Sequence, residues 1–192
     1  DSLLVLDELG EIPAQEAGNA AYMLSGGVSK NRATKETTLS EQQEWRLLFL
    51  SSGEISLASH IASSGQQANV GQEVRMIDLP AEASKEFGVF EEIHHCKSSG
   101  EFASLLSLNT EKLFGSPIIV FLEKIVEDSH VAEKISQLRK DFTQKADIPK
   151  HGQTHRALKR FSLVAAAGEL AIELGILPWE KNEALICLRI DF

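Results

Sequence analysis

The stretch LLVLDELG, residues Leu3 to Gly10, joins four large apolar residues to an acidic pair, Asp7 and Glu8. A short continuous apolar run bounded by acids and a glycine is typical of a strand buried in a sheet. Two adjacent carboxylates at the end of such a strand can hold a magnesium ion and activate a water molecule, as nucleotide hydrolysis requires. Apolar strands also end in acids without any catalytic role, so the pair alone leaves both interpretations open.

Strand-like and helix-like segments alternate along the first half of the chain. Apolar residues from Ala17 to Leu24 keep helical spacing, and residues 29–43 form a polar, basic segment that we interpret as a loop. WRLLFL, Trp45–Leu50, predicts a second buried strand, and VRMIDL, Val74–Leu79, predicts a third; Ile55–Ala62 between them has helical spacing. This alternation predicts an α/β fold with a parallel sheet of about three strands.

The pattern becomes helical after about residue 98, so we predict two parts, residues 1–97 and 98–192, the second being all-helical. We predict helices over Glu101–Leu113, Pro117–Val126, Val131–Lys145 and His155–Leu174, and a last helix from near Pro178 toward Cys187. The run Ala165–Gly168 contains only small residues. We interpret it as a device for close helix packing rather than as a ligand site.

The composition excludes some functions for the chain as a whole. Its 192 residues are 43% hydrophobic and 24% charged, as in ordinary globular proteins, and no apolar run approaches the roughly 18 residues of a membrane span, so we expect no membrane partner. Cys96 and Cys187 form no CxxC pair, which fits a reducing cytoplasm. The net charge of −9 makes the whole chain a poor non-specific binder of nucleic acid.

The charge is nevertheless uneven. Between Arg139 and Arg160 there are seven Lys or Arg residues and two Asp residues. Such a stretch is commonly a solvated helix face, and it can also be a local phosphate-binding patch.

Two further polar features follow the predicted strands. Ser51 and Ser52 come at the end of the second strand, where α/β proteins place site residues and where serine is also common in turns and helix caps. Arg75 begins the third predicted strand and can stabilise charge on a phosphoryl group or form a surface ion pair.

Five blocks together resemble a known family: DSLLVLDELG, EAGNAAYMLSGGVSKNRA, EWRLLFLSSGEISLASHI, GQEVRMIDLPAEA and RALKRFSLVAAAGELA. In this order, from Asp1 to about Trp179, they resemble the domain of unknown function family 927 of phage- and plasmid-type primase-helicase proteins. The resemblance implies a P-loop ATPase core of the additional-strand class, akin to superfamily-three helicases. We therefore expect an incomplete P-loop NTPase-type parallel sheet in residues 1–97.

The resemblance also implies roles for individual residues. Asp7 matches the magnesium ligand of the Walker B pair and Glu8 its catalytic base. Ser51 or Ser52 takes the sensor position, where helicases usually have Asn or Thr, and Arg75 matches an arginine-finger candidate. The basic positions of the loop and of the helical part are candidates for binding DNA or nucleotide: Lys30, Arg32, Arg156, Lys159 and Arg160.

The phosphate-binding half of such a site is missing. No GxxxxGK[ST] occurs in the chain, and SGGVSKN has the wrong spacing and follows a helix. We therefore expect the chain to be the C-terminal portion of a longer DNA-replication ATPase of a mobile element, inactive without its upstream Walker A region. The parent would use ATP and Mg²⁺, act on DNA and form a homo-oligomer, whereas this chain alone would hold no cofactor.

Two other functions are compatible with the residues. The chain can be a non-catalytic interaction module with a decayed nucleotide site, or a nucleic-acid-binding module that uses only the basic stretch. His94-His95-Cys96, and His151 with His155, lack the spacing of a metal site, because adjacent loop residues do not point at one ion. No nucleophile-elbow motif supports a serine hydrolase.

Overall fold

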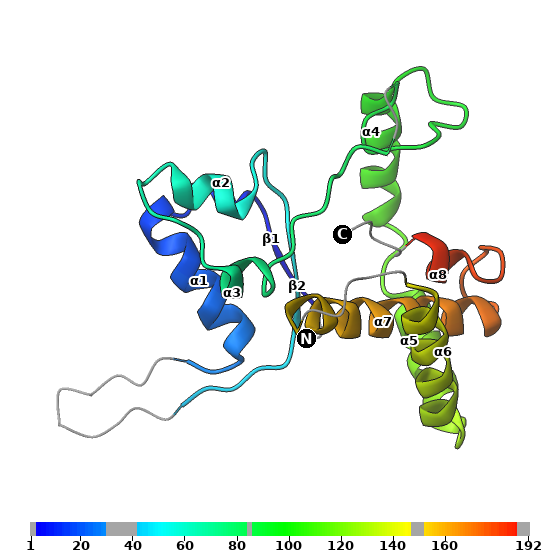
Figure 1. The fold of residues 1–192 in the computed structure, drawn as a ribbon. Coiled ribbons are helices and arrows are strands. Elements are labelled where there is room, and N and C mark those ends of the chain that lie inside the picture. Colours follow the sequence, from blue (N-terminus) through cyan, green and yellow to red (C-terminus); the bar gives the residue numbers. More distant parts are fainter. Residues whose placement is uncertain (1–2, 30–41, 84–85, 147–151, 188–192) are drawn as a thin grey trace. The chain divides into compact units, whose positions relative to one another are not determined.

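The computed structural model describes residues 3–29, 42–83, 86–146 and 152–187. The chain forms two compact units, Asp1–Asp78 and Leu79–Phe192 (Figure 1). The first unit is α/β and the second is helical, which confirms the predicted fold class.

The first unit has two parallel strands joined through a helix. Its elements are β1 (Leu3–Leu6), the short 3-10 helix η1 (Leu9–Glu11), α1 (Ala14–Gly26), β2 (Leu48–Ser51), α2 (Leu57–Ala62) and α3 (Val70–Glu73). The register pairs Leu3 with Leu48 and continues to Leu6 with Ser51. The first predicted strand is confirmed in its position, but it is not buried, because Leu3, Leu4 and Val5 are exposed. The second is shorter and lies further along the chain than Trp45–Leu50.

The core of this unit lies between α1 and α2. Ala17 and Ala21 of α1 and Leu57 and Ile61 of α2 are buried, and half-buried apolar side chains pack against them. Gly18 also faces inward, and a side chain there would collide with the amide of buried Gln72. Small residues on α1 therefore let the neighbouring segments approach closely.

The predicted third strand, Val74–Leu79, is wrong. The backbone N–H groups of Arg75 and Met76 both donate to the carbonyl of Gln72, at 3.0 Å, so the chain is still turning where the strand should begin. Met76 packs on the core, and the carboxylate oxygens of Asp78 accept from the N–H of Leu57 at 3.2 Å, at the start of α2. These local bonds compete with strand pairing, and the described sheet has two strands.

The two ends of the predicted loop after α1 are hydrogen-bonded to each other. Gly27 ends α1 at φ 71°, and its carbonyl accepts from the N–H of Trp45 at 2.8 Å. Val28 and Glu44 form an antiparallel bridge just beyond. The loop stem is thus defined by residues 27–29 and 43–45, whereas residues 30–41 lie outside the described part of the chain.

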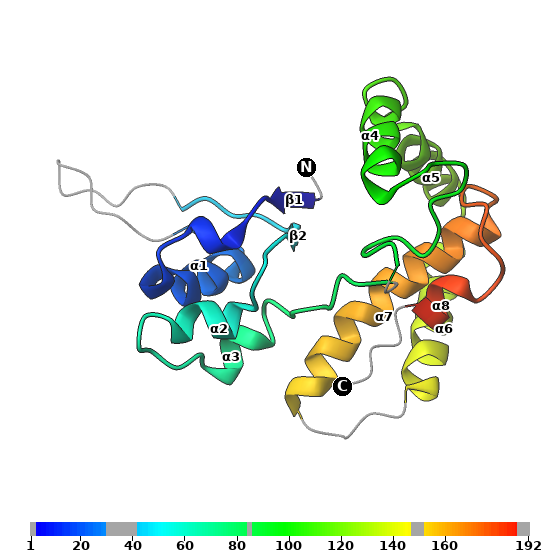
Figure 2. The same cartoon turned by 90° about the horizontal axis from the view of Figure 1, so that it is seen from above.

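The second unit consists of helices. They are α4 (Ser99–Thr110), α5 (Ser116–Glu127), α6 (Val131–Lys145), α7 (Gly152–Glu173) and α8 (Glu183–Cys187). All five predicted helices are confirmed to within a few residues, with the last beginning at Glu183 rather than near Pro178. Helices α6 and α8 both pack on α7 (Figure 2). Among the described residues, no helix has both the length and the apolar content to cross a membrane.

The small residues of α7 do serve packing, as predicted. Ala165 and Ala166 have no exposed surface, and a Cβ built on Gly168 would lie 2.9 Å from the Cβ of Ala184 in α8. Ala165 also shares an apolar cluster with Phe142 of α6. One face of α7 therefore receives both neighbouring helices.

A charged pair fixes the start of α6. The Lys134 ammonium lies 2.6 Å from Asp128 Oδ2, and the N–H of His130 donates to Asp128 Oδ1 at 2.8 Å. The donated bond from Lys134, followed by that of His130, lowers the pKa of Asp128 below its usual 3.8. The same bond raises the pKa of Lys134 above its usual 10.5.

Candidate functional site

The acidic pair lies at the carboxyl end of β1, next to the end of β2. Because Leu6 is in register with Ser51, the next residues, Asp7 and Ser52, face each other. The Ser52 hydroxyl donates to Asp7 Oδ1 at 2.9 Å and accepts from the N–H of Glu8 at 2.9 Å. These three residues therefore form one hydrogen-bonded cluster, which we call the acidic cluster.

Backbone bonds hold this cluster in place. The N–H of Ser52 donates to the carbonyl of Leu6 at 3.1 Å, and the N–H of Leu9 donates to the carbonyl of Ser52 at 3.2 Å. The parallel ladder thus continues one step beyond the strands. The orientation of the cluster follows from the pairing of β1 and β2.

Glu8 has a left-handed backbone, with φ 53° and ψ 78°. Such a conformation is uncommon for a residue other than glycine. Its carboxylate lies over Gly10, where a Cβ would come within 2.8 Å of Glu8 Oε1. Glycine at position 10 therefore leaves room for the Glu8 side chain.

The cluster has the chemical groups for metal-assisted hydrolysis. Asp7 is exposed and Glu8 is half-buried, so both can be reached from solvent. Carboxylate oxygens are the ligands that Mg²⁺ prefers, and a second carboxylate beside the metal can accept a proton from water. The Ser52 hydroxyl is the polar group of the neighbouring strand that contacts the pair.

The two serines named as sensor candidates differ in their contacts. The Ser51 hydroxyl donates to the carbonyl of Ser52 at 3.0 Å, which is a local backbone bond. The Ser52 hydroxyl instead contacts Asp7 and the backbone of Glu8. The geometry therefore places Ser52, and not Ser51, in the acidic cluster.

Arg75 lies against α1. Its Nη1 donates to the carbonyl of Gly71 at 2.7 Å, and its guanidinium carbon lies 4.4 Å from the centre of the Tyr22 ring. A Cβ on Gly71 would come within 2.5 Å of the Tyr22 hydroxyl, so glycine there permits this stacking. Arg75, two residues beyond the end of α3, is thus held by a carbonyl of that helix and by an aromatic face.

The predicted basic positions divide between described and undescribed segments. Lys30 and Arg32 lie in the loop outside the described residues. Arg156, Lys159 and Arg160 lie on α7 in the second unit, and all three are exposed. Their spacing of three and four residues places them on one face of the helix.

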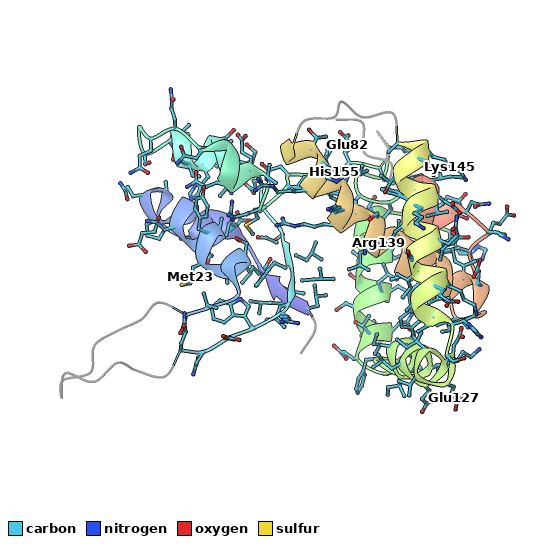
Figure 3. All side chains as sticks on the ribbon, turned by 60° about the horizontal axis from the view of Figure 1, so that its bottom comes forward. Met23, Glu82, Glu127, Arg139, Lys145 and His155 are labelled. Carbon is cyan, nitrogen blue, oxygen red and sulfur yellow. The ribbon has the colours of Figure 1, made fainter. Side chains whose placement is uncertain are left out.

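Arg139 of the same basic stretch has a structural position. Its Nε donates to the hydroxyl of buried Ser162 at 3.2 Å, and its Nη2 lies 3.5 Å from the carbonyl of Lys159. Figure 3 shows Arg139 and Lys145 on α6 and His155 on α7. The stretch therefore covers two packed helices, and one of its cations contributes to their packing.

Sequence reasoning missed one buried acid, Glu169 of α7, which is 1% exposed. Its Oε1 accepts from the N–H of Asn182 at 2.6 Å, just before α8, and its Oε2 has no hydrogen-bond partner among the described residues. The signal was present in the sequence, because LVAAAGELA places one acid within an otherwise small and apolar run. Glu169 ties the start of α8 to α7.

The family model described as "Domain of unknown function (DUF927)" matches residues 1–44. This segment contains the acidic pair and α1, and it is under a quarter of the chain. The resemblance beyond residue 44 stays a prediction. No curated protein and no solved structure was found to match the chain.

Proposed function

We propose that the acidic cluster is the magnesium-binding and water-activating half of a nucleoside-triphosphate hydrolysis site. The observation that carries the proposal is the bonding of Ser52 to both members of the acidic pair, at the carboxyl ends of two adjacent parallel strands. Open α/β sheets place their ligands at this edge. The family-model match over residues 1–44 covers the pair and supports the same interpretation.

The roles follow from the chemistry of each group. Asp7 would hold Mg²⁺, while Glu8 would orient and deprotonate the attacking water. Ser52 would sense the γ-phosphate through the pair that it bonds. Arg75 would complete the site of a neighbouring subunit in a homo-oligomer, which requires it to leave the Tyr22 ring.

The phosphate-binding loop would come from chain outside these 192 residues, since no GxxxxGK[ST] occurs within them. We therefore propose that this portion belongs to a helicase- or primase-like ATPase that acts in DNA replication of a mobile element. Catalysis of phosphoryl transfer is mostly positioning, and a carboxylate pair alone cannot orient a triphosphate. The purified chain by itself should accordingly show no turnover of ATP.

The test compares two acids of the same segment in the longer polypeptide that includes a phosphate loop. Glu8→Gln should abolish ATP turnover and leave nucleotide binding nearly unchanged, because it removes the base and keeps Asp7. Glu11→Gln, which neutralises an exposed acid of η1 three residues later, should retain turnover. Equal turnover in both variants would contradict the proposal and favour an interaction module with a decayed site.

A second candidate function is supported by the exposed cations of α7. Arg156, Lys159 and Arg160 on one helix face would bind the phosphate backbone of DNA. Lys159→Glu should weaken binding of the chain to duplex DNA and reduce the salt slope by about 1, while Lys97→Glu, the same charge change elsewhere in this unit, should not. Equal weakening by both variants would indicate a general charge effect and no site on α7.

A further inference from the structure

Helices α4 and α5 are rich in apolar residues, yet neither buries a single side chain. Ten large apolar residues of these helices and their connection are exposed: Leu105, Leu106, Leu108, Leu113, Phe114, Ile118, Ile119, Val120, Leu122 and Val126. A helix that is apolar around much of its circumference is normally buried. An isolated helix of 12 residues is also marginal in water, so this pair needs a partner surface.

The contacts of α5 identify which side is free. The Lys124 ammonium donates to the carbonyl of Leu174 at 2.7 Å, so this position faces the end of α7. Ile118, Leu122 and Val126 repeat every four residues and form one line along the helix, with exposed fractions of 51%, 50% and 83%. We call this line, with the other seven exposed residues, the α4–α5 apolar surface.

Helix α4 is also anchored on one side. The Phe102 ring packs edge-on against Phe90 and His94, with ring centres 4.9 and 5.4 Å apart. The side chains of Leu105 and Leu108, one and two turns further along, are exposed. Helix α4 is therefore attached to its own unit near its start, at Phe102, and the apolar side chains further along it are exposed.

The charges near this surface argue against nucleic acid or membrane as its occupant. A membrane-surface helix carries Lys or Arg on its polar face. The charged residues of α4, of α5 and of their connection are four glutamates and two lysines: Glu101, Glu111, Glu123, Glu127, Lys112 and Lys124. The ammonium of Lys124 is bound to a carbonyl. Phosphate groups and anionic lipids would meet an excess of glutamates and a row of aliphatic side chains, whereas the apolar face of a protein would be complementary.

The size of the surface matches what a dimer needs. Full burial of one such side chain removes roughly 60–120 Å² of apolar area from water. Burial of all ten, which are about half exposed, would therefore remove roughly 350–700 Å² from solvent. A standard interface buries about 800 Å² per partner and is about 65% apolar in homodimers, which requires roughly 500 Å².

We infer that the α4–α5 apolar surface is a self-association surface, on which the α4–α5 pair of a second copy of this chain packs to form a two-fold dimer. A two-fold interface uses the same patch on both subunits, and an aliphatic patch is complementary to itself. This dimer needs no nucleotide and involves no residue of the acidic cluster. It therefore stands or falls independently of the proposed hydrolysis site.

The test uses the whole chain and three leucines that are exposed to similar extents. Sedimentation equilibrium should show a concentration-dependent dimer of the unmodified chain. Leu122→Glu should weaken the dimer on the order of 100-fold, because two carboxylates would be buried per dimer. Leu163→Glu on α7, 48% exposed, and Leu50→Glu on β2, 60% exposed, should leave the dimer intact.

Each contrary outcome overturns the inference. These are a monomeric unmodified chain, a dimer that survives Leu122→Glu, a dimer broken by Leu50→Glu alone, and a monomer that binds anionic phosphatidylserine vesicles. Hydrogen exchange on the unmodified chain gives a second measurement that needs no variant. Amides of residues 99–127 should gain protection as protein concentration rises, while those of α7 do not, and protection that is independent of concentration would also refute the dimer.

Discussion

Adding one methyl group at Gly168 should separate α8 from α7. A Cβ there would lie 2.9 Å from the Cβ of Ala184, whereas apolar carbons are comfortable at about 3.5–4.0 Å. Neither carbon belongs to a flexible side chain, so the helices themselves must move, and overpacking of this kind costs about 1–3 kcal/mol. Alanine also favours a helix over glycine by about 0.8–1.0 kcal/mol. Gly168→Ala should therefore lower the free energy of unfolding of the second unit by up to roughly 2 kcal/mol.

The assay can isolate this unit, since the two tryptophans lie in different units. In a Trp45→Phe background, the fluorescence of Trp179 would report urea unfolding of the second unit. Gly152→Ala is the control for adding a methyl group to α7 without a collision, because a Cβ at this first residue of the helix has no neighbour within 4 Å. Ala184→Gly combined with Gly168→Ala should recover stability, with a coupling energy of about 1–2 kcal/mol. Unfolding of Gly168→Ala at the same urea concentration as Gly152→Ala, or at a higher one, would show that the added methyl group does not separate the helices.

Three further predictions concern single contacts. Ser52→Ala removes two hydrogen bonds of the acidic cluster and should destabilise the first unit by roughly 1–2 kcal/mol in urea denaturation, whereas Ser51→Ala should cost less than half as much. The lowered pKa of Asp128 means that its pairing with Lys134 stabilises the fold above the ordinary Asp pKa and is lost as pH falls through the lower folded pKa. Asp128→Asn should flatten stability measured below about pH 4, and an unchanged acid limb would contradict this. Gly27→Ala should destabilise the loop stem by roughly 1–3 kcal/mol in thermal unfolding, because φ is 71° and the new Cβ would meet a carbonyl oxygen at 2.7 Å; unchanged stability would contradict it.

Periodicity predicted the helices well because each one carries its own signal. The helix predicted over Val131–Lys145 has the same bounds in the structure, and the small residues of α7 indicated close packing before any contact was known. Strands are harder to predict, since their formation depends on a neighbour elsewhere in the chain. VRMIDL has a strand-like composition, yet bonds to Gln72 and the capping of α2 by Asp78 use its backbone and side chains locally.

The candidate site was predicted only in part, because it too depends on pairing between distant segments of the chain. A pair of acids after an apolar run can be read directly, and parallel pairing then decides which serine lies opposite. The choice between Ser51 and Ser52 depends on a register of one residue, which the sequence does not specify. The contact of Arg75 with Tyr22 joins residues 53 positions apart, and no local pattern indicates it.

The left-handed backbone at Glu8 sets folding stability against the proposed activity at one position. Glycine adopts such a conformation freely, whereas other residues pay of the order of 1–3 kcal/mol of strain. A search for more heat-resistant variants that scored folding alone would therefore favour Glu8→Gly, and that variant would look like an improvement in every melting experiment. It would also lack the carboxylate that the proposed reaction needs. A library selected for activity should retain the strained glutamate, and a library selected for stability should lose it. This difference would distinguish selection for activity from selection for stability.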